Sequence, residues 1–186
     1  QPRLNLPKLS KEKLKKLYSE FQAIGWLLEA KKGKKGYFDL SSEFEKAKLQ
    51  PGGEGFIKLW LVRIQGEDRL SILIHPPSQV SWRVKLKPGS KLRFGAGFPS
   101  EVWDKIGSGT YYLVKVKPRF GKTETVFSVL VDPKHNPEQR KWNDFEVSLA
   151  KFGQNKIELI LETKTIGPND WCVAFWSRPH LVQEGS

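Results

Sequence analysis

Short runs of alternating apolar and polar residues make up most of the chain after residue 55. A period of two places successive side chains on opposite faces of a strand, and turn-forming residues separate the runs. The runs are 56–64, 70–75, 80–86, 91–98, 110–117, 123–131, 145–152, 156–163 and 171–176. About nine strands at this spacing, with no long helices between them, predict an all-β fold: a two-sheet antiparallel β-sandwich of the jelly-roll type.

The first 55 residues follow a different pattern. Residues 1–9 have the composition of a linker, and Ser10 is a suitable helix N-cap. Apolar residues then recur at spacings of three and four, at Leu14, Leu17, Tyr18 and Phe21. This spacing predicts one amphipathic N-terminal helix over 11–24. We therefore expect residues 1–55 to form a linker and a helix that packs on the module, and residues 56–186 to form the β-sandwich.

The last run, 171–176, is apolar on both faces of the predicted strand. Its two sets of side chains are Trp171, Val173 and Phe175 on one face and Cys172, Ala174 and Trp176 on the other. One face belongs to the core, and the other must meet a second buried layer, a ligand or a partner. The residues Ser177, Arg178 and Pro179 are expected to end the strand, because proline donates no backbone hydrogen bond.

The composition allows a substantial core and adds a strong positive charge. Hydrophobic residues make up 38% of the 186 residues, and the formal net charge is +12. Residues 81–125 contribute +7 of this excess, from ten Lys and Arg against three Asp and Glu. Such a field attracts nucleic acid, anionic glycans or a membrane surface. The alternative is the lysine-rich solvated surface of a thermostable protein.

Several predicted strands place their cations on a single face. Arg83 and Lys85 share one face of 80–86, and Lys115 and Lys117 share one face of 110–117. If these strands are neighbours, the cations form an electropositive surface for phosphate, sulfate or uronate groups. The alternative is the ordinary solvent-exposed face of a sheet whose other side is core.

The chain holds seven tryptophans, more than a core of this size requires. Trp60 and Trp82 lie inside predicted strands, and we expect both in the core. Trp103, Trp142 and Trp171 lie in or beside polar loops. Their rings either plug the end of the sandwich or form flat platforms on which a sugar ring stacks, Trp142 being the weaker candidate.

Polar groups suited to sugar hydroxyls lie near these loop tryptophans, at Asn143, Asp144 and Asn169. Catalytic motifs are absent: there is no GxSxG, P-loop or HExxH, and the three histidines adjoin proline or asparagine. The single cysteine, Cys172, is expected to be an inert core thiol, and no Cys/His zinc pattern exists. We therefore expect a binding protein and not an enzyme.

Two segments resemble carbohydrate-binding modules of the jelly-roll, galactose-binding-like type. The first is "HPPSQVSWRVKLKPGSKLRFGAGFPSEVWD", and the second runs from "RKWNDFEVSLAKFGQ" through "IELILET" to "AFWSRPHL". Together the resemblance covers roughly residues 56–183. It implies a non-catalytic sandwich of the kind found as extracytoplasmic domains in bacterial membrane proteins and polysaccharide-processing enzymes.

The resemblance also implies roles for particular residues. The aromatic residues that match Trp142 and Trp176 are often structural in such modules. Some relatives hold a structural calcium through loop carbonyls and one acidic side chain, for which Asp132 or Asp144 is available. The strong positive charge departs from modules that bind neutral sugars, and it favours acidic glycans.

The leading hypothesis is a non-catalytic, extracytoplasmic module of a larger exported or membrane-anchored protein, with a polysaccharide or glycoconjugate as its partner. The chain has no methionine, as expected of a piece of a longer protein, and no run of about 18 apolar residues that would cross a membrane. The alternative is a protein-interaction or homo-oligomeric assembly module with the same fold and no sugar. Nucleic acid is disfavoured, because the tryptophans lie away from the basic segment and no nucleic-acid-binding motif is present.

Overall fold

The computed structural model describes residues 10, 12–13, 36–51 and 55–183. Residues 36–186 form a compact unit separate from residues 1–35. The helix expected over 11–24 lies outside the described residues except for its positions 12 and 13. Ser10 Oγ accepts a hydrogen bond from the Lys13 backbone N–H at 3.3 Å, the contact expected of an N-cap.

The strands of the compact unit pair into two antiparallel sheets, as the sequence predicts. They are β1 (Phe38–Asp39), β2 (Lys48–Gln50), β3 (Ile57–Ile64), β4 (Glu67–Ile74), β5 (Ser78–Lys85), β6 (Ser90–Gly97), β7 (Thr110–Pro118), β8 (Glu124–Val131), β9 (Asn143–Ser148), β10 (Lys156–Thr165) and β11 (Phe175–Gln183). Single 3₁₀ turns lie at η1 (Phe44–Lys46), η2 (Ser100–Val102), η3 (Pro137–Gln139) and η4 (Ala150–Phe152). No helix among the described residues is long and apolar enough to cross a membrane.

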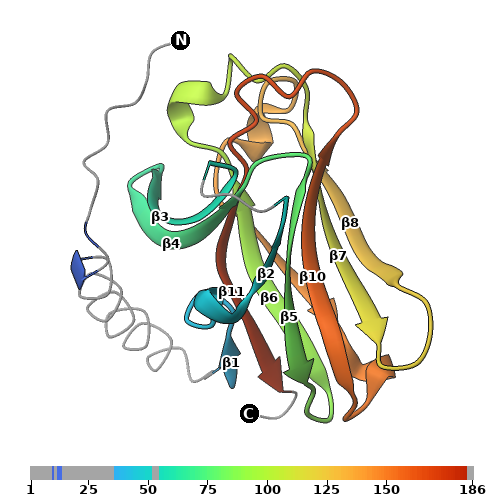
Figure 1. Cartoon of the computed structure of the whole chain (residues 1–186). Helices are drawn as coiled ribbons and strands as arrows, with labels where there is room; N and C mark the ends of the chain where they lie inside the picture. The colour runs from blue at the N-terminus through green and yellow to red at the C-terminus, as the bar shows by residue number, and fades with distance from the viewer. Residues whose placement is uncertain (1–9, 11, 14–35, 52–54, 184–186) are drawn as a thin grey trace. The chain divides into compact units, whose positions relative to one another are not determined.

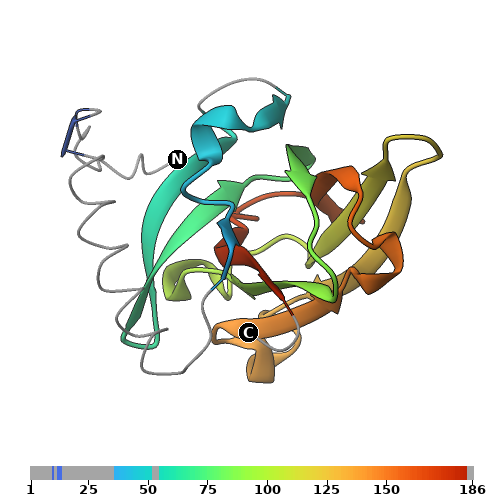
Figure 2. The same cartoon turned by 90° about the horizontal axis from the view of Figure 1, so that it is seen from below.

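The two sheets face each other across one core (Figures 1 and 2). The six-stranded sheet has the order β3-β4-β11-β6-β9, with β1 also paired to β11, and the five-stranded sheet has the order β2-β5-β10-β7-β8. The loops 98–109, 132–142 and 166–174 gather at one end, at the top of Figure 1. The β7–β8 turn lies at the opposite end, because β7 runs from the first of these loops to that turn.

The sandwich begins earlier than the expected boundary at residue 56. β1 and β2 pair with β11 and β5. Leu40 is fully buried, and the Trp82 indole N–H donates to the Glu43 carbonyl oxygen at 3.1 Å. Residues 36–51 therefore belong to the sandwich and not to a linker. Strands of two and three residues are too short for their alternation to be visible in the sequence.

The last strand also differs from the prediction. β11 begins at Phe175 and passes through Pro179 to Gln183. A register shift between Ser177 and His180, with Arg178 at φ 45°, forms a bulge that lets the strand continue. The Pro179 carbonyl still accepts the Leu40 N–H at 3.0 Å. Proline therefore does not end the strand here.

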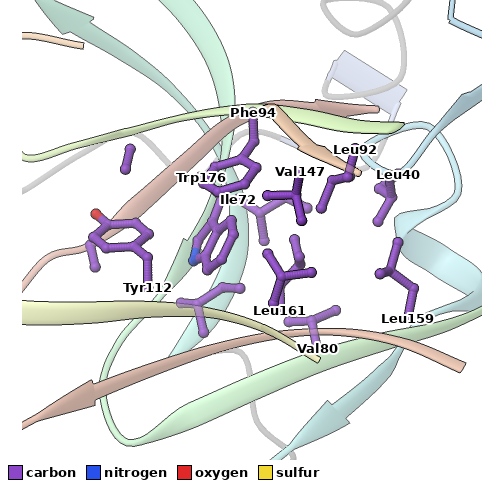
Figure 3. Close-up of a cluster of buried hydrophobic side chains, with 14 of the residues drawn as sticks. Leu40, Ile72, Val80, Leu92, Phe94, Tyr112, Val147, Leu159, Leu161 and Trp176 are labelled. Atoms are coloured by element: carbon purple, nitrogen blue, oxygen red, sulfur yellow. The ribbon is translucent and has the colours of Figure 1, made fainter. Parts of the chain in front are cut away.

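Aromatic residues from both sheets fill the centre of the core (Figure 3). Trp176 is fully buried, with ring centroids 4.6 Å from Phe94 and 5.1 Å from Tyr112. Burial raises the pKa of Tyr112, whose hydroxyl donates to the Gly97 carbonyl at 3.2 Å. Trp82 is 2% exposed and Cys172 is fully buried, as expected for both. Burial also raises the pKa of the Cys172 thiol, which suits an inert side chain.

A second apolar cluster lies on the outer face of the six-stranded sheet. Its buried members are Val62, Ile64, Leu73, Trp142 and Phe175. Leu73 alternates along β4 with Ile72 and Ile74, which point into the main core. Strands near this cluster are therefore apolar on both faces. The last run of the sequence is an example, because Trp176 packs in the main core and Phe175 in the second cluster.

Candidate functional site

A cavity of about 500 Å³ opens beside the turn between β3 and β4, and we call it the hairpin pocket. Its lining residues are Trp60, Leu61, Val62, Arg63, Gln65, Gly66, Pro99, Ser100, Glu101 and Phe175. One wall is β3, an edge strand of its sheet, and another is the segment 99–101 that leads into η2. The volume lies in the range of small-ligand sites.

The turn that shapes the pocket is a tight two-residue connection. Gln65 and Gly66 join β3 directly to β4, and their φ angles are 49° and 79°. Positive φ at both central residues is typical of a type I′ hairpin turn, which matches the twist of the flanking strands. The turn thus fixes Gln65 and Gly66 at the rim.

Trp60 supplies the aromatic wall, although the sequence places it in the core. Its ring is only partly buried and packs against the second cluster, with Lys58 Nζ 4.3 Å from the ring centroid. The indole groups of Trp82, Trp103 and Trp142 donate to backbone carbonyls. Among the described residues, no backbone carbonyl accepts a hydrogen bond from the Trp60 indole N–H.

Polar side chains line the same pocket as Trp60. Gln65, Ser100 and Glu101 are exposed at the pocket wall. Arg63 Nε donates to Asp68 Oδ1 at 2.8 Å, and this ion pair raises the pKa of Arg63 and lowers the pKa of Asp68. The pocket therefore combines a flat aromatic surface with amide, hydroxyl, carboxylate and guanidinium groups.

The three loop tryptophans of the sequence analysis occupy different environments. Trp142 is 7% exposed, donates to the Glu67 carbonyl at 3.2 Å and is a structural member of the second cluster. Its buried ring has no face open for a sugar. Trp103 is partly buried, packs on the same cluster and bonds the Phe98 carbonyl at 2.9 Å. The ring of Trp171 is partly buried and packs against the main core. Lys105 Nζ lies 5.0 Å from its ring centroid.

The polar side chains predicted beside these tryptophans form hydrogen bonds within the protein. The Asn143 side-chain amide donates to backbone carbonyls, including Lys141 O at 3.0 Å, and the Asn169 amide donates to Pro76 O at 3.1 Å. Both Asp144 oxygens accept hydrogen bonds from Arg69, at 2.5 and 3.1 Å. None of these three residues lines the hairpin pocket.

The two carboxylates considered for calcium are held by cations or by their own turn. Asp144 is bound to the guanidinium of Arg69, and Asp132 Oδ2 lies 2.8 Å from His135 Nδ1. Among the described residues, no three His, Cys, Asp or Glu side chains gather as metal ligands. A structural calcium held by loop carbonyls and one of these two carboxylates stays a prediction.

The four predicted basic residues lie on the outer face of the five-stranded sheet. β5 and β7 flank β10, so Arg83 and Lys85 stand on one side of that strand and Lys115 and Lys117 on the other. Lys115 forms an ion pair with Glu162. Arg83, Lys85 and Lys117 are exposed and lie toward the end with the β7–β8 turn. The structure does not bring these cations to the tryptophans.

The hairpin pocket was not predicted from the sequence. A partial signal exists, because the run 56–64 is apolar on both faces and a QG pair follows it. The contribution of Ser100 and Glu101 has no local signal, since it depends on the 98–109 loop folding back toward β3.

Comparison with known proteins begins with sequence. No protein-family model matches the chain. A protein of Archaeoglobus fulgidus, described as uncharacterized, is 35% identical over 131 residues, which are 65% of this chain and 32% of that protein. The chain thus spans about a third of the length of this relative.

Solved structures identify the fold. The module TmCBM61, solved in complex with beta-1,4-galactotriose, superposes with a TM-score of 0.54 and 15% identity over 81% of this chain and 99% of that one. The chain has the fold of a carbohydrate-binding module. A CBM51 from Clostridium perfringens GH95, in complex with methyl-galactose, gives a TM-score of 0.47 and 18% identity over 78% of this chain and 98% of that one. The two-sheet β-sandwich fold expected from the sequence is confirmed.

Proposed function

We propose that the chain is a non-catalytic carbohydrate-binding module whose ligand site is the hairpin pocket. The observation that carries the proposal is the partly exposed Trp60 ring on the wall of a pocket of about 500 Å³. Its indole donor has no hydrogen-bond partner among the described residues. A pyranose has an apolar C–H face that packs on an aromatic ring, while its hydroxyls need nearby polar partners. Gln65, Ser100 and Glu101 supply these partners.

Galactose-containing oligosaccharides are the first ligands to test. The module TmCBM61, which shares the fold, was solved in complex with beta-1,4-galactotriose. A preference for acidic glycans is a further part of the proposal. Arg83, Lys85 and Lys117 lie too far from the hairpin pocket to contact a short oligosaccharide held there, so Lys58 and Arg63 are the cations that would select an acidic sugar.

We further propose that this module is part of a larger extracytoplasmic protein, exported or anchored to a membrane, and that it positions that protein on a glycan. The length of the Archaeoglobus fulgidus relative supports a multidomain context. Trp103 and Trp171, at the loop end, are candidates for additional contacts with a longer sugar chain.

A glycan array at low and high salt, followed by calorimetric titration of the best ligand, tests the proposal. We expect a dissociation constant between about micromolar and millimolar, because one stacked ring and a few hydrogen bonds contribute modestly. Trp60→Ala should weaken binding about tenfold and Glu101→Gln severalfold, since both remove contacts inside the pocket. Salt should weaken acidic ligands more than neutral ones.

Two variants serve as controls. One tests whether a substitution in the pocket leaves the fold intact, and the other tests whether the binding site lies at the loops. Glu101 is exposed and makes no described ion pair, so Glu101→Gln should keep the melting temperature of the parent. Trp171→Ala should change affinity less than Trp60→Ala does. Loss of binding only in Trp171→Ala would move the site to the loops, and no binding to any glycan would favour the protein-assembly function.

A further inference from the structure

The end of the sandwich farthest from the loops carries an exposed aromatic side chain on a hairpin tip. Residues 119–123 join β7 to β8 in a hairpin at the lower right of Figure 1. Phe120, within this connection, is 84% exposed. Gly121 has φ 133°, a conformation that other residues rarely adopt, so the turn depends on this glycine. Arg119 Cζ lies 5.2 Å from the Phe120 ring centroid. Lys122 follows Phe120 by two positions in the sequence. An isolated phenylalanine presented in this way has no role in the core.

Strand register brings further cations to the same end. On β10, Lys156 lies across from Lys85 of β5, and Glu158 lies across from both Arg83 of β5 and Lys117 of β7. Glu158 lies between these two cations, and it accepts a hydrogen bond from Ser81 at 2.7 Å. We call the following exposed residues the basic end: Arg83, Lys85, Lys117, Arg119, Lys122 and Lys156. Within the described part of the chain, no carboxylate forms an ion pair with any of the six.

We propose that the basic end docks on an anionic lipid surface, with the Phe120 ring inserted among the headgroups. Clustered Lys and Arg residues are attracted to anionic lipids, and each strengthens binding about fivefold. Aromatic rings at the boundary of the bilayer add apolar burial, so one exposed aromatic among cations suits a membrane interface. A single-stranded nucleic acid would need a row of aromatic platforms, and the basic end has one.

Co-sedimentation of the full chain with vesicles tests this inference. The vesicles contain phosphatidylcholine alone or phosphatidylcholine with 30% phosphatidylglycerol, in low and high salt. We expect binding only to the anionic vesicles, weakened at least tenfold at high salt. Phe120→Ala should lower the partition coefficient about fivefold or more, and Lys122→Gln about fivefold.

Matched variants on other surfaces separate the basic end from net charge and general hydrophobicity. Ile166, 77% exposed in the 166–174 loop, and Lys141, exposed in the 132–142 loop, are the controls. Ile166→Ala and Lys141→Gln should each change partitioning less than twofold. Equal binding to neutral and anionic vesicles, no vesicle binding, or equal losses in test and control variants would overturn the proposal. A soluble polyuronate that binds the basic end with unchanged affinity in Phe120→Ala, without vesicle binding, would assign this end to anionic polymers instead.

Discussion

Arg69 shows how a single buried cation shapes the outer face of the six-stranded sheet. Its side chain is 11% exposed, lies across Gly95, and bonds Asp144 and Ser177. Burial alone would lower the pKa of Arg69, but the hydrogen bonds that its guanidinium donates to Asp144 and Glu67 raise it. A Cβ added at Gly95 would clash with Ser177 Oγ and lie 2.7 Å from Arg69 Nη1.

Gly95→Ala should therefore lower the free energy of unfolding by roughly 1–3 kcal/mol, the usual cost of overpacking. Denaturant titration measures this loss. Gly55→Ala is the matched control, because a Cβ there meets no atom within 4 Å. Similar midpoints for both variants would mean that the Arg69 network is not packed over Gly95.

Glu162 gives the prediction for pH. Burial alone would raise the pKa of its carboxyl, but hydrogen bonds from Lys115 and Lys164 hold it below its ordinary value. A carboxyl whose pKa is lower in the folded state than in the unfolded state stabilises the fold at any pH above its unfolded-state pKa. This stabilisation is lost as the pH falls through its folded-state pKa. Between about pH 5 and pH 3, Glu162→Gln should therefore lose less stability than the parent. The measurement is the free energy of unfolding of both proteins as a function of pH. Parallel curves between about pH 5 and pH 3 would contradict the claim that Lys115 and Lys164 lower the pKa of Glu162.

The tryptophans mark what the sequence can assign at the scale of residues. Trp82 is predictable, because it alternates with apolar neighbours in a strand whose other face is polar. Trp60, expected in the core, lines a pocket, whereas Trp142 takes the structural one of its two expected roles and is buried. Their exposure depends on the second cluster, whose members come from β3, β4, β11 and the segment before β9. No local pattern reports such a long-range assembly.

Among elements, the long strands are predictable and the short or bulged ones are not. Runs such as 110–117 and 156–163 agree closely with β7 (Thr110–Pro118) and β10 (Lys156–Thr165), since their alternation extends over several residues. β1 and β2 have no visible period, and the bulge at Arg178 hides the true extent of β11. The sequence pattern therefore predicts a start of the sandwich that is too late in the chain.

Leu40 tests this boundary directly. It is fully buried in the main core although it precedes the expected first strand. Leu40→Ala should lower the free energy of unfolding by about 2–5 kcal/mol, the range for buried leucines that leave a cavity. Phe56→Ala, at a side chain that is 50% exposed, should lower it far less. If Leu40→Ala leaves the free energy of unfolding almost unchanged, residues 36–51 are a linker and not part of the sandwich.

At the scale of the whole sandwich, the two proposed binding surfaces lie at opposite ends. The hairpin pocket includes residues 99–101, which precede β7, and the basic end includes the turn that follows it. Substitutions at sites this far apart, with no shared partners, should act independently. Phe120→Ala should keep the glycan affinity of the parent within twofold, and Trp60→Ala should keep its partitioning to anionic vesicles. A loss of both activities in either variant would show that the two surfaces are one.

The central claim, a sugar site at Trp60, is tested most directly by nuclear magnetic resonance of the indole N–H groups. Each of the seven tryptophans in the sequence gives one indole N–H signal, so the individual residues can be followed separately. On titration with the best glycan from the array, the Trp60 signal should shift in proportion to saturation, because its donor lies at the pocket. The signals of the buried Trp82, Trp142 and Trp176 should stay in place. A saturating glycan that moves the Trp103 or Trp171 signal and leaves Trp60 unchanged, or the absence of any responding glycan, would contradict the account.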